Sequence, residues 1–292
     1  MTTIDVIIPT RNRPMLTQRA LRSVLDQSHT DVTVHVVDDG SDAGSYAELR
    51  EAIAALPRVN LIRNEMSLGP ALARQVGFDA GVAEWVATLD SDDEWLPTKL
   101  TQQLALADAT HADLVLCWFA WVREDGSTRV VRKPDGRGRV SPSLTNNIDI
   151  PLARRALVQG CGAFRGDDAS PHHCDEHVDF MMRLLSQAEV AVVPEVLVHC
   201  HDHAGDRASD DIGANVESYQ RLIDARAPLF ADFPDDLATL HARLGARMLA
   251  AGQRREGLRQ MRGAFTTATW PRRAHLVREF GPFTIKRMVT PR

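Results

Sequence analysis

The sequence predicts an α/β protein with a mostly parallel sheet flanked by helices and a C-terminal helical extension. Two observations lead to this prediction. Short apolar runs alternate with helical patterns through the first half of the 292-residue chain, as they do in repeated βαβ units. Strand signals then stop after about residue 211, and only helical periodicity continues.

The first half justifies the sheet element by element. Residues 4–9 form an almost continuous apolar run, typical of a strand buried on both faces of a parallel sheet. Pro14 opens a helix with Leu16, Ala20 and Leu21 on one stripe. Further strands are predicted at 32–37, 59–63, 85–89 and 114–121, and helices at 43–55, 69–80 and from about 97.

The second half is less regular. Residues 123–147 are rich in Gly, Pro, Arg and Ser and predict a long surface segment with a hairpin at its start. The periodicity then predicts a helix at 175–187, an extended segment at 190–198, and three helices at 214–226, 235–251 and 254–267.

Composition limits the function. A formal net charge of −5 argues against a nucleic-acid partner. The four cysteines form no C-x-x-C pair, so a structural zinc site is not expected. In a chain of this length they do not indicate a disulfide framework either, and we expect a reducing compartment. The N-terminus has no signal-peptide pattern, and no apolar run approaches the roughly 20 residues of a bilayer span. We expect a cytoplasmic protein, with peripheral contact at the inner face of the membrane left open.

Three polar clusters follow predicted strands: Thr10–Arg13, Asp38–Ser41 and Asp90–Asp93. Each has an ordinary structural interpretation, as a helix cap, a turn or a solvated arginine. Ligands of parallel α/β sheets, however, bind at the carboxyl ends of the strands. Clusters far apart in the sequence would meet there, and that convergence is stronger evidence than any one cluster.

The acidic cluster at Asp90, Ser91 and Asp92 suits a divalent cation. Carboxylates at the end of an apolar strand are costly to desolvate unless they find a cation. Mn²⁺ and Mg²⁺ are hard ions that take carboxylate and phosphate oxygens. A metal between Asp92 and a diphosphate would neutralise the leaving group.

Together these segments resemble the family 2 glycosyltransferases, whose GT-A fold is Rossmann-like. The resemblance implies that Pro9, Thr10, Arg13 and Asp39 hold the nucleoside, and that Asp90 and Asp92 face ribose and metal. The donor-binding set also includes Arg11, Asp38, Asn64, Gly69, Arg74 and Ser91. The motifs that carry the resemblance are Val6–Arg13, Val36–Ser41, Asn64, Leu68–Arg74 and Leu89–Asp93.

The resemblance also implies a general base near the start of the 175–187 helix. Relatives usually carry Glu-Asp-x-Asp there, and this chain has His177 where the usual Asp stands. A base must be deprotonated and within reach of the acceptor hydroxyl. We order the candidates Glu176, then Asp179, then His177. The structural alternative is that the acids cap the helix and His177 is a surface residue.

Histidines near residue 200 offer a third metal ligand. His199, His201 and His203 alternate, so on a strand they would share one face. Family members often carry a His before a loop ending in Ser, and His203 to Ser209 matches that pattern. We therefore assign His203 as a metal or diphosphate ligand, and His199 and His201 as strand residues.

The domain limits combine this resemblance, which covers about the first hundred residues, with the end of the strand signals near residue 212. Residues 1–211 would form the GT-A catalytic domain, with a nucleotide-sugar half at about 1–110 and an acceptor half at about 111–211. Residues 212–292 would form a helical region. Its arginines indicate a solvated basic face, with attraction to anionic lipid or an acidic acceptor as the alternative.

The predicted reaction is inverting transfer of a sugar from a nucleotide-diphosphate donor to an acceptor hydroxyl, assisted by Mn²⁺ or Mg²⁺. A UDP-sugar is the first choice of donor, with thymidine and guanosine open. The acceptor could be a glycan, a lipid-linked carrier, a peptide or a small molecule, and the oligomeric state is undetermined. The alternatives are a non-catalytic sugar-nucleotide-binding scaffold and a nucleotidyltransferase, although Thr10–Arg13 lacks the glycines that the latter needs.

Overall fold

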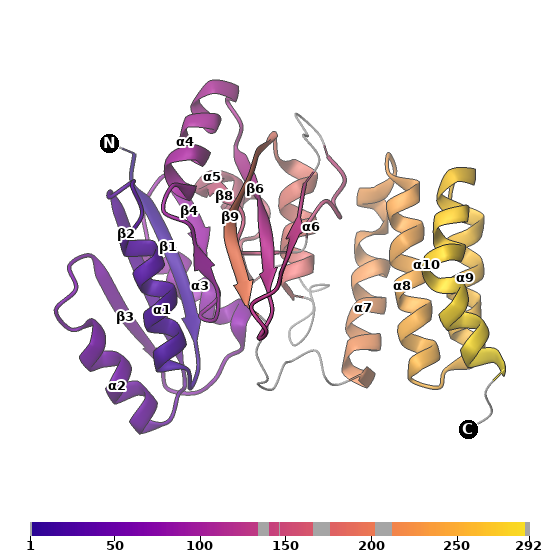
Figure 1. The fold of residues 1–292 in the computed structure, drawn as a ribbon, viewed down its shortest axis with the longest axis horizontal. Coiled ribbons are helices and arrows are strands. Elements are labelled where there is room, and N and C mark those ends of the chain that lie inside the picture. Colours follow the sequence, from indigo (N-terminus) through magenta and orange to yellow (C-terminus); the bar gives the residue numbers. More distant parts are fainter. Residues whose placement is uncertain (1, 134–139, 146, 166–175, 202–211, 290–292) are drawn as a thin grey trace.

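A computed structural model describes residues 2–133, 140–145, 147–165, 176–201 and 212–289. Figure 1 shows a sheet with its helices in one part of the molecule and a group of upright helices beyond α6. Within these described residues the sheet has nine strands in the order β3-β2-β1-β4-β8-β6-β9-β5, with β7 paired to β6. The predicted α/β class is confirmed.

The first four strands run parallel to one another, so their carboxyl ends lie at one edge of the sheet. Every residue of β1 is buried, as its continuous apolar run predicts. Thr10 at the end of β1 pairs with Asp38 of β2, and Asp38 pairs with Arg63 of β3. The polar ends of these strands therefore lie at the same edge. The strands are β1 (Ile4–Thr10), β2 (Val32–Asp39), β3 (Val59–Asn64) and β4 (Trp85–Thr88).

The helices between these strands pack close against the sheet. On α3, a Cβ added at Gly77 would lie 2.6 Å from Cγ2 of Ile7 in β1, so glycine permits the close approach of helix and strand. Residues of both elements belong to the main core. These helices are α1 (Pro14–Leu25), α2 (Ala43–Ile53) and α3 (Pro70–Ala80).

The rest of the sheet is mixed. Strand β8 runs antiparallel to β4 and β6, β6 runs parallel to β9, and the predicted hairpin is present as β6 with β7. The short β5, β8 and α5 were not predicted, because two to six residues carry too little periodicity. The elements are α4 (Lys99–Thr110), α5 (Arg155–Gly160), α6 (Glu176–Gln187), β5 (Glu94–Trp95), β6 (Leu114–Val122), β7 (Thr128–Val131), β8 (Leu152–Arg154) and β9 (Val190–His201).

The C-terminal helices pack onto the sheet part through α6, where Val178 and Met182 share a core with α7 and α8. The three predicted helices are confirmed as α7, α8 and α9. A further helix, α10, was not predicted, because Gly281 and Pro282 within it are unfavourable in helices. None of the described helices is both long and apolar enough to cross a membrane. The elements are α7 (Ile212–Arg226), η2 (Ala227–Phe230), α8 (Pro234–Ala250), α9 (Arg254–Thr267) and α10 (Trp270–Val289).

Candidate functional site

The first two polar clusters are joined by hydrogen bonds. The backbone N–H of Asn12 donates to Oγ of Ser41 at 2.8 Å, and the N–H of Asp42 donates to Oδ1 of Asn12 at 2.9 Å. Asn12 has a φ of +54°, a left-handed conformation that asparagine tolerates. The turn after β1 is therefore held against the turn after β2.

The third cluster joins them through Asp92. Nη1 of Arg13 lies 2.8 Å from Oδ2 of Asp92, whose side chain is 18% exposed. The guanidinium of Arg19 donates to the backbone carbonyl of Asp92. The three strand ends therefore meet in space, as the sequence predicts.

Asp39 organises the connection between β3 and α3. Its carboxylate accepts hydrogen bonds from Nδ2 of Asn64 and Oγ of Ser67, each at 2.8 Å. It also accepts from the backbone N–H groups of Leu68 and Gly69, each at 2.9 Å. Both oxygens are engaged, so a nucleobase that bonded to Asp39 would have to share or displace one of these donors.

Close packing of this connection against β2 requires a glycine. A Cβ on Gly40, which has a φ of +71°, would lie 2.6 Å from the backbone nitrogen of Ser67. Nη1 of Arg11 donates to Oγ of the same serine at 3.2 Å. Asp38 is fully buried, with Oδ2 3.9 Å from Nε of Arg63.

Pro9 and Thr10 lie inside the sheet. Pro9 pairs with Val37 of β2. Oγ1 of Thr10 lies 2.6 Å from Oγ1 of Thr17 on α1, which donates to the carbonyl of Arg13 at 2.7 Å. The threonine hydroxyl thus ties β1 to α1. Ser91 is also buried.

Arg74 connects the acids of the donor half to the predicted base. Its buried guanidinium places Nη2 2.6 Å from Oδ1 of Asp90 and Nη1 3.7 Å from Oε1 of Glu176. Glu176 opens α6 and follows Asp90 by more than eighty residues. One guanidinium therefore brings together the two halves predicted from the sequence.

Glu176 is ionised and partly covered. Burial raises its pKa, but the hydrogen bond with His177 and the charges of His177 and Arg74 outweigh burial, and the pKa lies below its usual value. Its side chain is 11% exposed, and Nδ1 of His177 is 3.9 Å from Oε1. Such a carboxylate can accept a proton at neutral pH.

Asp179 has different surroundings. Oδ2 lies 2.7 Å from Nε of Arg183, and Oδ1 lies 2.6 Å from Nε of Arg226 on α7. Its side chain is only 1% exposed. These contacts favour a structural role for Asp179, because a carboxylate engaged by two guanidinium groups ties α6 to α7.

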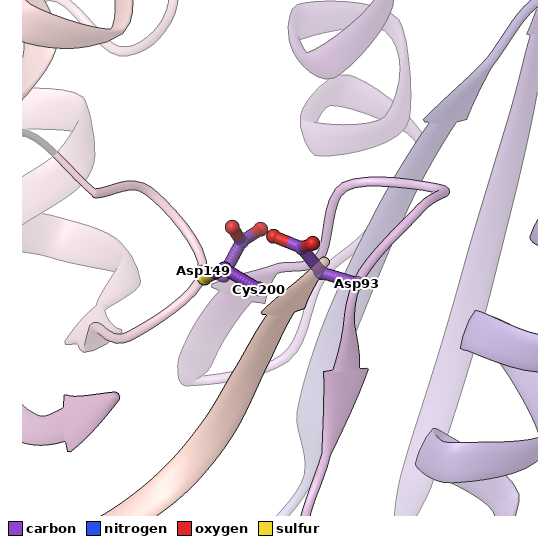
Figure 2. A group of neighbouring side chains, drawn as sticks. All are labelled: Asp93, Asp149 and Cys200. Atoms are coloured by element: carbon purple, nitrogen blue, oxygen red, sulfur yellow. The ribbon is translucent and has the colours of Figure 1, made fainter. Parts of the chain in front are cut away.

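Three buried side chains, those of Asp93, Asp149 and Cys200, lie together at the turn after β4. Figure 2 shows the carboxyl groups of Asp93 and Asp149 facing each other, with Cys200 beside Asp149. Oδ1 of Asp149 accepts the backbone N–H of Asp90 at 2.6 Å, and Oδ1 of Asp93 accepts the N–H of His201 at 2.9 Å. The pair therefore fixes the turn that carries Asp90 and Asp92.

Burial is the largest influence on the pKa values of these three side chains. It raises the pKa of Asp93 to about 7 and lifts that of Asp149 well above its usual value, with the charges of Asp90 and Asp93 adding to the effect. Burial also raises the pKa of the Cys200 thiol. A proton shared between the two carboxyl groups offsets their repulsion.

Two sets of acids could hold a metal. The ligand atoms of Asp93, Asp149 and Cys200 lie within 4.8 Å of one another, but a thiol suits softer ions than Mn²⁺ or Mg²⁺. Asp90 and Asp92 offer oxygen ligands only, and their side chains are 34% and 18% exposed. The outer pair therefore fits a hard ion better. His203 lies outside the described residues.

Sequence reasoning missed Arg19, Ser67 and Asp149. Arg19 and Ser67 look like ordinary surface residues in the sequence. A signal for Asp149 exists: it stands between Ile148 and Ile150, and an acid between apolar residues needs a buried partner.

The sequence profile described as "Glycosyl transferase family 2" matches residues 5–165. The chain is 35% identical over 115 residues to the "Putative colanic acid biosynthesis glycosyl transferase WcaA" of Escherichia coli, covering 38% of this chain and 40% of that protein. It is 30% identical over 124 residues to the "Putative teichuronic acid biosynthesis glycosyltransferase TuaG" of Bacillus subtilis, covering 42% and 49%. The matches thus span less than half of these relatives.

The fold also resembles that of a solved structure. S. aureus TarS 1–349 in complex with UDP-GlcNAc superposes with a TM-score of 0.70 at 16% identity. The match covers 98% of this chain and 89% of that chain. The same part of TarS in complex with UDP gives a TM-score of 0.65, also over 98% and 89% of the two chains. At 16% identity the likeness concerns the fold alone, and it confirms the predicted GT-A fold.

Proposed function

Because the chain belongs to glycosyl transferase family 2, we propose that it moves a sugar from a nucleotide-diphosphate donor to an acceptor hydroxyl with inversion at the anomeric carbon. The observation that carries this proposal is the link from Asp90 through Arg74 to Glu176. It puts an ionised carboxylate next to the acids that would face the donor. A transferase of this kind needs both groups at one site.

The proposed donor is a UDP-sugar. Support comes from the joined turns after β1, β2 and β4, and from the similar TarS structures, which are complexes with UDP-GlcNAc and UDP. Arg11, Arg13 and the 64–69 connection would line the nucleotide side, with Asp39 exchanging one of its present donors for the base. Guanidinium groups in such a position suit diphosphate oxygens.

The proposed cofactor is Mn²⁺ or Mg²⁺, held by Asp92 and Asp90. A divalent ion there would supply positive charge for the departing diphosphate. The chain's own contribution is to position the two carboxylates: Arg13 and Arg19 hold Asp92, while Arg74 and Asp149 hold Asp90. His203 remains a proposed third ligand.

The proposed base is Glu176. The acceptor oxygen would form a bond to the anomeric carbon as the bond to the diphosphate oxygen breaks on the opposite face, and the acceptor proton would pass to Glu176. The lowered pKa keeps Glu176 ionised for this step. His177, next to Glu176, would help to orient it, and Asp179 would anchor α6.

We assign residues 1–211 to catalysis, with donor and acceptor halves meeting near residue 110, and residues 212–292 to the helical region. Cytoplasmic location is likewise a prediction. The acceptor remains a glycan, a lipid-linked carrier, a peptide or a small molecule.

The test uses water as a stand-in acceptor. Purified protein is incubated with a panel of nucleotide sugars and Mn²⁺, and release of the nucleoside diphosphate is followed, with donor binding measured by calorimetry. We expect Glu176→Gln to lower release by about a hundredfold or more while donor binding survives. The control Glu51→Gln changes an exposed acid on α2 and should act like the wild type.

Two results would contradict the proposal. Normal release by Glu176→Gln would remove Glu176 as the base. Donor binding by the wild type without release or transfer to any acceptor would favour the non-catalytic scaffold.

A further inference from the structure

Charge is divided unevenly along the chain. Residues 254–292 contain ten Arg or Lys residues and only two Glu, a net charge of +8. The whole chain carries −5, so the first 253 residues carry −13. Helices α9 and α10 hold most of the basic residues of this segment. Both helices lie at the end of the molecule away from the sheet (Figure 1). The helical end of the protein that lies away from the sheet is therefore positively charged.

An exposed apolar stripe runs along α10 at this end. Trp270 is 80% exposed and Val277 is 53% exposed, and Ala274 between them is also exposed. Their spacing of four and three residues puts all three on one face of the helix. Leu276, on another face, is buried in the core shared by α8, α9 and α10. The helix is thus anchored by one face and presents a second apolar face to solvent.

Exposed arginines also lie at this end of the molecule, on α10 and on α9. Arg278 on α10, and Arg255 and Arg262 on α9, are exposed, and among the described residues none has an acidic partner. Arg259 differs, because it pairs with Glu256. Unpaired guanidinium groups leave the positive charge of this end available to a partner.

We propose that this end of the protein docks on an anionic lipid bilayer. Trp270 and Val277 would enter the boundary between headgroups and acyl chains, and Arg255, Arg262 and Arg278 would face the anionic headgroups. Tryptophan is the side chain best suited to that boundary, with an apolar body and a polar N–H.

Other occupants fit less well. A second copy docked through the same face would bring two positively charged segments together, and these repel. A soluble polyanion would pair with the arginines but leave Trp270 and Val277 in water. Of these three occupants, the anionic bilayer satisfies both the charge and the apolar stripe.

Vesicle sedimentation tests the proposal with the full chain and no donor. We expect binding to phosphatidylcholine vesicles that contain phosphatidylglycerol, and little binding to phosphatidylcholine alone. The triple variant Arg255→Gln, Arg262→Gln, Arg278→Gln should lose about a hundredfold in affinity. The double variant Trp270→Ser, Val277→Ser should lose about tenfold or more.

Matched controls use exposed residues of the sheet part. Arg22→Gln on α1 and Val82→Ser after α3 should bind vesicles as the wild type does, since both positions are exposed there. Circular dichroism and thermal unfolding check that each variant folds. Diphosphate release in solution should be unchanged in all of them, which separates this proposal from that of the catalytic function.

Three results would overturn the proposal. The first is equal binding to vesicles with and without phosphatidylglycerol. The second is wild-type binding by the triple variant. The third is wild-type binding by the Trp270 and Val277 variant together with full competition by dextran sulfate, which would identify a site for soluble polyanions.

Discussion

The four acids around the end of β4 fall into two pairs with different surroundings. Asp90 and Asp92 are partly exposed, and each has an arginine partner. Asp93 and Asp149 are buried, and burial raises the pKa of both. The outer pair therefore suits a cation, while the inner pair holds the turn in place with a shared proton.

This difference predicts a pH effect on stability. The pKa of Asp93 is raised from 3.8 to about 7, so the folded protein binds the proton more tightly than the unfolded chain. Its contribution to the free energy of unfolding is therefore present at low pH and is lost as pH rises from about 4 to about 7. Asp93→Asn removes this dependence and can keep the hydrogen bonds of the pair.

Urea unfolding in EDTA measures the effect. The stability of the wild type relative to Asp93→Asn should fall by about 3 kcal/mol between pH 5 and pH 8. A difference that stays constant between these two pH values would show that Asp93 titrates near its ordinary pKa.

Helices α8 and α9 pack backbone against backbone at Gly245 and Gly257. A Cβ on Gly245 would lie 2.8 Å from the carbonyl oxygen of Gly257, and a Cβ on Gly257 would lie 2.9 Å from that of Gly245. The two backbones therefore touch, and neither can make room without moving its helix.

Gly245→Ala should lower the free energy of unfolding by about 1–3 kcal/mol, because the added methyl group separates the helices. The matched control is Gly263→Ala on α9, where a Cβ would meet nothing within 4 Å. That variant should be neutral or slightly more stable, since alanine favours the helix. Chemical denaturation compares the two, and equal effects would refute the close contact.

Elements with long, regular patterns could be predicted from the sequence, and short or interrupted ones could not. The strands and helices of the parallel half follow their apolar periodicity closely. β8 has three residues and depends on β4 and β6 for its hydrogen bonds. α10 is stabilised by packing of Leu276 and Phe280 against its neighbours, which propensity alone does not reveal.

Across the whole molecule, the meeting of the strand ends could be predicted because parallel sheets place them at one edge. The partners within the site could not. Asp149 reaches the N–H of Asp90 from a segment 59 residues later, and Arg226 reaches Asp179 across 47 residues. Such contacts depend on strand order and helix packing, which a single sequence does not specify.

In the proposed mechanism, acids from separate strand ends bind a divalent ion and a nucleoside diphosphate together. Calorimetric titration of UDP into the protein, with Mn²⁺ or with EDTA, tests it most directly. The variants are Asp92→Asn and the control Asp108→Asn, an exposed acid on α4. We predict that UDP binds with Mn²⁺, and that EDTA or Asp92→Asn weakens binding by about tenfold or more, while Asp108→Asn has no effect. The mechanism would be contradicted if UDP bound in EDTA, or to Asp92→Asn, as tightly as it binds to the wild type with Mn²⁺. Absence of binding of any nucleotide with Mn²⁺ would also contradict it.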